Sequence, residues 1–225
     1  MAQNLSGKKL GIIHAALITT RAVQKYLDEI IPEVEVVHFV DDTIQNTNFA
    51  CAPGTIPPGN YAKFVQAARS QQEYGVDLIL LACSTFNRAV EHARPMITTP
   101  MLQIDRPMMD LAVRHGGRVG LLATVPTTVP ASERLLRLAA ADAGRAVEIT
   151  TRLCSDAFAA LKAGQVEKHN TMLLAEIDRL AGEVDAIVLA QLSMSALEPR
   201  LTATKVPVYN SGRTAFNHIR GLLEA

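Results

Sequence analysis

The chain has 225 residues, of which 48% are hydrophobic and 20% charged, and its 22 Lys and Arg balance its 22 Asp and Glu. This composition is typical of a globular protein with a real core and excludes an intrinsically disordered chain. Zero net charge without a basic run excludes the electrostatic footprint of a nucleic-acid-binding protein, so nucleic acid is not an expected partner. The length permits either one large domain or two modest ones.

The three cysteines, Cys51, Cys83 and Cys154, are an odd number without CxxC spacing. This pattern argues against a disulfide framework and a structural zinc site. The apolar runs are shorter than the ~18 residues that span a membrane. We therefore expect a cytoplasmic protein without a membrane segment. Leu10–Ile18 follows two lysines as in a signal peptide, but His14 interrupts the run, so we interpret it as a first buried strand.

Short β-branched, apolar runs alternate with longer segments of helical spacing, a pattern typical of βα units around a parallel sheet. The expected strands are Leu10–His14, Val34–Phe39, Leu78–Ala82, Met101–Ile104, Val119–Ala123, Val147–Thr151, Ala186–Ala190 and Pro207–Tyr209. The expected helices are Thr20–Ile30, Tyr61–Glu73, Phe86–Arg94, Pro107–Val113, Ala131–Ala143, Asp156–Lys162, Val166–Gly182, Ser195–Thr202 and Thr214–Leu223. The segment Asn46–Gly59, rich in proline and glycine, predicts a long ordered loop or lid, with a flexible linker as the alternative.

The sequence contains an internal repeat. Asp77–Cys83 resembles Asp185–Gln191, about 108 residues further along the chain, and two other pairs of segments keep nearly the same spacing. These pairs are Gly11–Ile13 with Gly120–Leu122 and Pro100–Leu102 with Pro207–Tyr209. The repeat predicts an α/β fold of two similar lobes, each a parallel sheet flanked by helices, related by a pseudo-two-fold axis with the active site between them. The expected lobes are residues 1–105, with a C-terminal helix 210–225 that packs back on them, and residues 106–209.

The repeat places Cys83 and Gln191 at equivalent strand ends. Ligands of open parallel sheets bind beyond the carboxyl ends of the strands, so we expect both side chains to face the cleft. Ser84 and Thr85 can cap the helix after Cys83 and can bind an anion, and a helix N-terminus favours a reactive thiolate. The alternative is a buried structural thiol.

Gln191 differs chemically from Cys83, because an amide donates and accepts hydrogen bonds but does not exchange a proton as a thiol does. It can therefore hold a substrate without ionising it. Leu192 and Ser193 follow it, and Ser193 takes the place of a helix cap. The alternative for Gln191 is a polar group at a helix start that the backbone satisfies.

Further polar residues follow the first strand of each lobe. His14, with Thr19 and Thr20 after it, could meet a carboxylate, although a lone histidine is more often structural. In the second lobe the equivalent strand end offers hydroxyl and amide donors for an anionic ligand, or simple helix caps, from Thr124, Thr127 and Thr128.

Two other residues are expected in structural or surface positions. We expect a structural role for Cys154, which nothing mirrors in the first lobe, and a surface or interlobe position for His169. The sequence lacks GxGxxG, GxxxxGK[ST] and HExxH motifs and any His/Cys cluster, so it suggests no dinucleotide, P-loop or metal site.

These residues resemble the aspartate/glutamate/hydantoin racemase superfamily, which includes arylmalonate decarboxylase and maleate isomerase. The similarity rests on Ala82–Thr85, Val188–Ser193 and Gly120–Thr124, and it spans nearly the whole chain. It implies an enzyme without a cofactor, independent of pyridoxal phosphate, that clamps a small carboxylate between two lobes while cysteines move a proton at the adjacent carbon. Position 83 matches the first thiol of the family, whereas position 191, where the second belongs, holds glutamine. A homodimer is expected from the resemblance alone.

The leading interpretation is a racemase-family isomerase that acts on a small carboxylate through Cys83. Enolate stabilisation would come from Thr85, Thr124 and the backbone amides beside Cys83 and Gln191. Two alternatives remain open at this point: a single-cysteine decarboxylase or lyase of the same fold, and a non-catalytic protein that binds small carboxylates.

Overall fold

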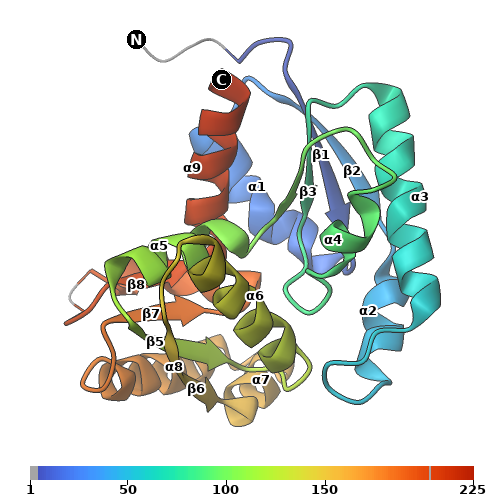
Figure 1. Cartoon of the computed structure of the whole chain (residues 1–225). Coiled ribbons are helices and arrows are strands. Elements are labelled where there is room, and N and C mark those ends of the chain that lie inside the picture. The colour runs from blue at the N-terminus through green and yellow to red at the C-terminus, as the bar shows by residue number, and fades with distance from the viewer. Residues whose placement is uncertain (1–4, 203) are drawn as a thin grey trace. The chain divides into compact units, whose positions relative to one another are not determined.

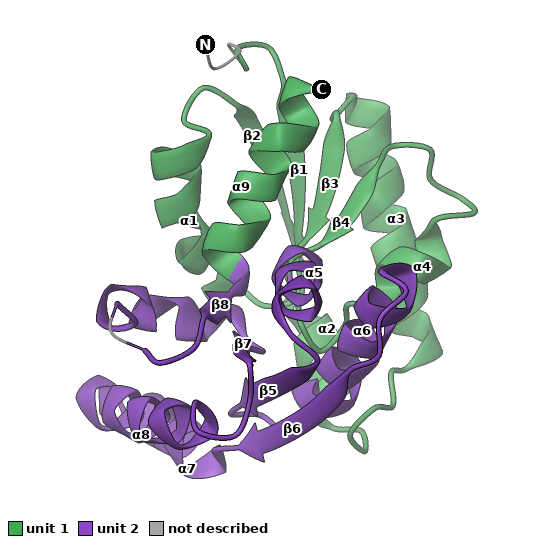
Figure 2. Cartoon of the chain, turned by 60° about the vertical axis from the view of Figure 1, so that its left-hand side comes forward, with its two compact units in different colours: residues 1–104, 212–225 green, residues 105–211 purple. Residues whose placement is uncertain are grey.

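The computed structural model describes residues 5–202 and 204–225. The chain divides into two compact units (Figure 2): unit 1 comprises residues 1–104 and 212–225, and unit 2 comprises residues 105–211. Each unit contains one four-stranded parallel sheet with helices around it. The prediction of an α/β fold with two similar lobes is confirmed.

Unit 1 contains a sheet with the strand order β2-β1-β3-β4, in which all neighbours are parallel. Figure 1 labels β1, β2 and β3, and Figure 2 labels all four strands. Its strands are β1 (Lys9–His14), β2 (Glu35–Val40), β3 (Leu78–Leu81) and β4 (Met101–Gln103). Its helices are α1 (Ile18–Ile30), α2 (Asp42–Phe49), α3 (Pro58–Tyr74), α4 (Ala89–Ala93) and α9 (Ser211–Glu224), which belongs to this unit from Gly212 onward.

Unit 2 repeats this topology with the parallel order β6-β5-β7-β8. Its strands are β5 (Arg118–Ala123), β6 (Glu148–Leu153), β7 (Ala186–Leu189) and β8 (Val208–Asn210). Its helices are α5 (Arg106–His115), α6 (Thr128–Asp142), α7 (Ser155–Lys162), α8 (Val166–Leu180) and the 3₁₀ helix η1 (Leu192–Arg200). All eight predicted strands are present, and no end differs from the prediction by more than two residues.

The two sheets share a detail at the amino ends of their central strands. The Asp77 carboxylate accepts a hydrogen bond from the backbone N–H of Lys9 (2.7 Å), and the Asp185 carboxylate accepts one from the backbone N–H of Arg118 (2.9 Å). Lys9 begins β1 and Arg118 begins β5, so the aspartates satisfy equivalent donors in the two units. This contact gives a physical reason for the repeated aspartate in the sequence.

The central strand β7 is buried on both faces of its sheet. Ala186 and Val188 pack in a cluster with α5 and α6, while Ile187 and Leu189 pack in a second cluster with α8 and η1. Side chains of a strand point alternately to the two faces, so helices cover both sides of this sheet. A strand buried on both faces reads as a continuous apolar run, which is why the sequence identified it.

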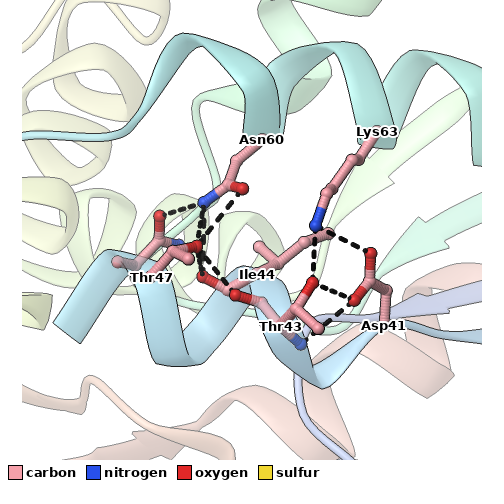
Figure 3. A network of polar contacts seen from close by, with 7 residues as sticks. Asp41, Thr43, Ile44, Thr47, Asn60 and Lys63 are labelled. Atoms are coloured by element: carbon pink, nitrogen blue, oxygen red, sulfur yellow. Dashed lines mark hydrogen bonds and ion pairs between the residues drawn. The ribbon is translucent and has the colours of Figure 1, made fainter. Parts of the chain in front are cut away.

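The helix α2 was missed by the sequence analysis, which expected Asn46–Gly59 to form a loop or lid. Residues 46–49 end α2 and residues 58 and 59 begin α3, so a connection of eight residues remains. Asp41 caps α2 by accepting a hydrogen bond from the backbone N–H of Thr43, and the Lys63 ammonium of α3 lies 3.3 Å from the Asp41 carboxylate (Figure 3).

Asn60 holds α2 against α3 from inside the unit (Figure 3). It is buried, and its amide nitrogen lies 2.8 Å from the Asn48 Oδ1, 2.9 Å from the Thr47 hydroxyl and 3.3 Å from the Ile44 carbonyl. Buried amide groups are hydrogen-bonded in most proteins, because a buried polar group without a partner lowers the stability of the fold. The helix α2 is therefore stabilised by contacts distant in sequence, which hydrophobic periodicity does not report.

The C-terminal helix α9 packs on α1 within unit 1. The rings of Tyr26 and Phe216 stack with their centroids 5.8 Å apart, and a Cβ atom added to Gly212 would lie 2.1 Å from the Tyr26 ring. The Arg213 guanidinium also lies 2.8 Å from the carboxylate of Glu29. Unit 1 is thus built from the two ends of the chain. No helix in the described parts of the chain is both long and apolar enough to cross a membrane.

Candidate functional site

Cys83 and Gln191 occupy equivalent positions in the two sheets. The last paired residues of β1 and β3 are Ile13 and Leu81, and those of β5 and β7 are Leu122 and Leu189. Cys83 and Gln191 each follow their strand by two residues. Both side chains therefore start from the carboxyl end of a central strand, where parallel sheets place their ligand-binding groups.

The Gln191 side chain is held in one orientation by Thr124, which follows β5. The Gln191 Oε1 lies 2.6 Å from the backbone nitrogen of Thr124 and 2.8 Å from its hydroxyl. A backbone N–H can only donate, so the atom that faces it must be the amide oxygen. The amide NH₂ therefore points away from Thr124, and Gln191 presents hydrogen-bond donors at this strand end.

This contact changes the role expected for Thr124. The residue is 1% exposed, and its N–H and its hydroxyl both donate to Gln191. The donors that we expected to stabilise an enolate directly are thus committed to Gln191. A direct contact of these two Thr124 donors with a ligand stays a prediction, and it would require their bonds to Gln191 to break.

Cys83 is partly buried and packs against the hydrophobic cluster of unit 1. Ser84 is buried and Thr85 is partly buried. The expectation that these two residues cap the next helix is wrong, because residue 84 lies in a bend, residues 85–88 form a turn, and α4 begins only at Ala89, with Arg88 at its N-cap. A helix N-terminus therefore does not directly follow Cys83.

His14 ends β1 and is fully buried. Its Nδ1 lies 2.7 Å from the Thr19 hydroxyl, and its Nε2 lies 2.9 Å from the Nδ1 of His38 in β2. Burial, and secondarily the nearby His38, lower the pKa of His14 to about 4. The ring is therefore neutral at physiological pH, and both nitrogens are engaged within unit 1. Binding of a ligand by His14 stays a prediction, and it would require one of these bonds to break.

The remaining polar residues of unit 2 lie around α6 and η1. Thr127 is the N-cap of α6 but makes no side-chain cap, and its Oγ1 is buried without a hydrogen-bond partner among the described residues. Thr128 is buried in the first turn of α6. Leu192 is buried, whereas Ser193 is exposed inside η1, so Gln191 rather than Ser193 occupies the N-cap position.

Cys154 and His169 lie elsewhere in unit 2. Cys154 opens α7 and lines a pocket of about 440 Å³ together with Glu176 and Arg179. Burial, followed by the charge of Glu176, raises the pKa of the Cys154 thiol, which makes it a poor nucleophile. The expected surface or interlobe position of His169 is wrong: the residue is 3% exposed, and its Nδ1 donates to the Ala157 carbonyl at 2.8 Å.

Sequence reasoning missed His38, which meets His14 through the parallel register of β1 and β2. The available hint was a histidine near the end of the predicted strand Val34–Phe39. Among the residues that the structure describes, no group of three or more His, Cys, Asp or Glu could hold a metal ion.

Comparisons with known proteins give one family. The family described as Asp/Glu/Hydantoin racemase matches residues 11–219. No protein with a curated functional description matches the sequence.

Three solved structures illustrate the similarity of fold. An aspartate racemase homologue from Pyrococcus horikoshii is 18% identical, with a TM-score of 0.75 over 97% of this chain and 100% of that one. Glutamate racemase from Thermus thermophilus is 18% identical, with a TM-score of 0.71 over 99% of this chain and 82% of that one. Unliganded arylmalonate decarboxylase is 16% identical, with a TM-score of 0.61 over 96% and 93%.

Proposed function

Because the chain belongs to the Asp/Glu/hydantoin racemase family, we propose that it transfers a proton at the carbon next to the carboxylate of a small substrate, with Cys83 as the exchanging group. Family membership supports an enzyme of the racemase or isomerase type. The proposal adds three points to family membership. The substrate is a small carboxylate, Cys83 exchanges the proton, and both strand ends contact the same ligand.

The observation that carries the proposal is the difference between two equivalent strand ends. One presents a thiol, Cys83, and the other presents an amide, Gln191, whose oxygen is occupied by Thr124. A thiolate can take a proton from carbon and return it, whereas a neutral amide does neither. The proposed site therefore has one group that titrates and one that only donates hydrogen bonds.

In the proposed reaction the Cys83 thiolate takes the proton from the substrate carbon. The electron pair of the broken C–H bond moves into the carboxylate and gives an enolate, which the thiol then reprotonates. A carbon acid is far weaker than a thiol of ordinary pKa, about 8.5, so the enolate needs oriented donors. Such donors are worth roughly 3–4 kcal/mol each, and the Gln191 amide N–H groups are the ones that the structure orients.

The amide at position 191 limits the stereochemistry. Inversion of a carbon centre by two bases needs an acid on one face and a base on the other. Cys83 alone supplies a proton from one face. We therefore propose exchange or isomerisation on a single face rather than two-base racemisation.

A decarboxylase is the second candidate, and the single thiol is the observation that favours it. Loss of CO₂ from a malonate-type diacid leaves the same enolate, which Cys83 would protonate from one side. This reaction consumes one proton per turnover and needs no second base. Measurement of CO₂ release from substituted malonates separates the two candidates.

The experiment is incubation of the full chain with a panel of small amino, hydroxy and dicarboxylic acids in heavy water, with deuterium at the α-carbon followed by NMR. We expect incorporation with at least one acid, its loss in Cys83→Ser, and its retention in the matched control Cys154→Ser. Cys83-independent incorporation, or none with any acid, contradicts the proposal. A carboxylate that protects Cys83 from alkylation without turnover would instead indicate a binding protein.

A further inference from the structure

We propose that His38 is a positioning residue for the loop after β1, acting through a hydrogen-bonded chain that runs from the exposed edge strand β2 through His14 to Thr19. The chain lies wholly within unit 1. The role of this hydrogen-bonded chain in the reaction rests on the proposed function, because the loop that the chain holds is next to Cys83.

The hydrogen bonds of this chain have one direction. The Thr19 hydroxyl has a single hydrogen and lies 2.7 Å from the carbonyl oxygen of Ala16, which can only accept. The hydrogen between Thr19 and His14 must then come from the Nδ1 of His14, at 2.7 Å. The Nε2 of His14 consequently has no hydrogen, and it accepts from the Nδ1 of His38, at 2.9 Å. The contacts thus assign one tautomer to His14.

The chain ends on the backbone beside the proposed reactive thiol. The Ala16 carbonyl accepts from both the hydroxyl and the N–H of Thr19, and the Ala15 carbonyl accepts from the N–H of Gln45 in α2. Ala15 and Cys83 each lie two residues beyond the last paired residues of β1 and β3. His38 therefore acts on the loop that flanks Cys83 without itself lying at that strand end.

The burial of the two rings decides which of them takes an added proton. The hydrogen bond between them survives either way, because His38 can move its own proton to its outer Nε2 and accept at Nδ1. Burial lowers the pKa of both histidines, but His14 is fully buried whereas His38 is exposed, and the neighbouring His38 lowers the pKa of His14 further. The exposed His38 thus takes the proton while His14 stays neutral.

The charged groups around the pair are already held by other partners. Asp28 of α1 lines a pocket of about 180 Å³ together with His38, and its carboxylate accepts from the Gln24 amide at 2.9 Å. Asp41 follows β2, and its N–H donates to the His14 carbonyl. Its carboxylate is paired with Lys63.

Removal of the His38 donor leaves the buried Nε2 of His14 without its partner. The imidazole then has a reason to rotate or change tautomer, which releases Thr19 and the loop. Displacement of a backbone segment that flanks the reacting group slows proton transfer more than it weakens substrate binding, and a shift of ~1 Å can reduce a rate by 10- to 100-fold.

The test is NMR of the imidazole nitrogens in histidine-labelled full-length protein, between about pH 5 and 8. In the wild type we expect the His14 proton on Nδ1 at every pH in this range. Of the two histidines, only His38 should titrate. His38→Asn, whose amide can replace the lost donor, should keep this tautomer, and His38→Leu should not. A neutral His14 with its proton on Nε2, or titration of His14 before His38, would contradict the proposed hydrogen-bonded chain.

The effect on the reaction is measured separately. We expect His38→Leu to lower kcat for Cys83-dependent deuterium exchange by about ten-fold with little change in KM, and His38→Asn to restore most of it. An unchanged kcat in His38→Leu refutes the positioning role. If the wild type shows no exchange, the proposed function fails. The NMR result still decides whether the hydrogen-bonded chain from His38 to Thr19 exists.

Discussion

The amide oxygen of Gln191 accepts two hydrogen bonds from a single residue, Thr124, through its backbone N–H at 2.6 Å and its hydroxyl at 2.8 Å. Two donors that converge on one atom stabilise negative charge there. Glutamine uses them to orient its amide. The sulfur of a cysteine at this position takes the place of the glutamine Cγ, and a thiolate there would lie in the electrostatic field of the same two donors.

The first prediction concerns Gln191→Cys. We expect the introduced thiol to have a pKa below the ordinary value of about 8.5, because the Thr124 donors favour the thiolate. The pH dependence of iodoacetamide alkylation, measured in a Cys51→Ser, Cys83→Ser and Cys154→Ser background, reports this pKa. Adding Thr124→Val removes one donor and should raise the pKa again. An ordinary pKa of the introduced thiol, both with and without Thr124→Val, would show that the two donors do not reach position 191.

The repeated part of the fold could be predicted from the sequence because its causes are local or periodic. β7 is buried on both faces and therefore forms a continuous apolar run, and Asp77 and Asp185 recur because each satisfies the first N–H of a neighbouring strand. Because the repeat identified equivalent strands, it also predicted that Cys83 and Gln191 occupy equivalent positions.

The parts that sequence reasoning missed depend on contacts between distant residues. The helix α2 buries a single apolar side chain, Ile44, and is otherwise held by Asn60 and Lys63 of α3. His38 reaches His14 because of the register of two strands, and Thr124 reaches Gln191 because β5 lies beside β7. Residue type alone does not report such pairings.

A second prediction concerns stability at acidic pH. His14 has a pKa of about 4 in the fold, compared with 6.5 when unperturbed. Below pH 6.5 the unfolded chain binds a proton that the native state does not, so stability falls as the pH decreases towards 4. This difference corresponds to at most about 3 kcal/mol. Urea unfolding between these pH values should show the slope in the wild type, and His14→Asn, which cannot titrate, should have a smaller one. Equal slopes would contradict the buried neutral histidine.

The third prediction compares two glycines of α9. In Gly212→Ala the new methyl group would lie 2.1 Å from the ring of buried Tyr26, so we expect a loss of about 1–3 kcal/mol of unfolding free energy. In Gly221→Ala the methyl group meets nothing within 4 Å, and we expect a gain of about 0.5–1 kcal/mol. Denaturant unfolding measures both. Similar effects of the two substitutions would contradict the packing of α9 on α1.

The fourth prediction concerns Cys154, whose raised pKa results from burial and from the charge of Glu176. Glu176→Gln removes that charge and should speed alkylation of Cys154 at pH 8 in a Cys51→Ser and Cys83→Ser background. Asp178→Asn, which removes the same charge from an exposed site on the same helix, is the matched control and should have little effect. Equal rates in the two variants would exclude Glu176 as a cause.

We propose that one titrating thiol, Cys83, moves the proton while Gln191 only orients the substrate. The most direct test follows one enantiomer of a turned-over acid in heavy water and measures deuterium incorporation and optical inversion in the same sample. We expect exchange to outpace inversion clearly in the wild type, and Gln191→Cys to bring the two rates together. Inversion as fast as exchange in the wild type, or exchange that survives Cys83→Ser, would contradict the account.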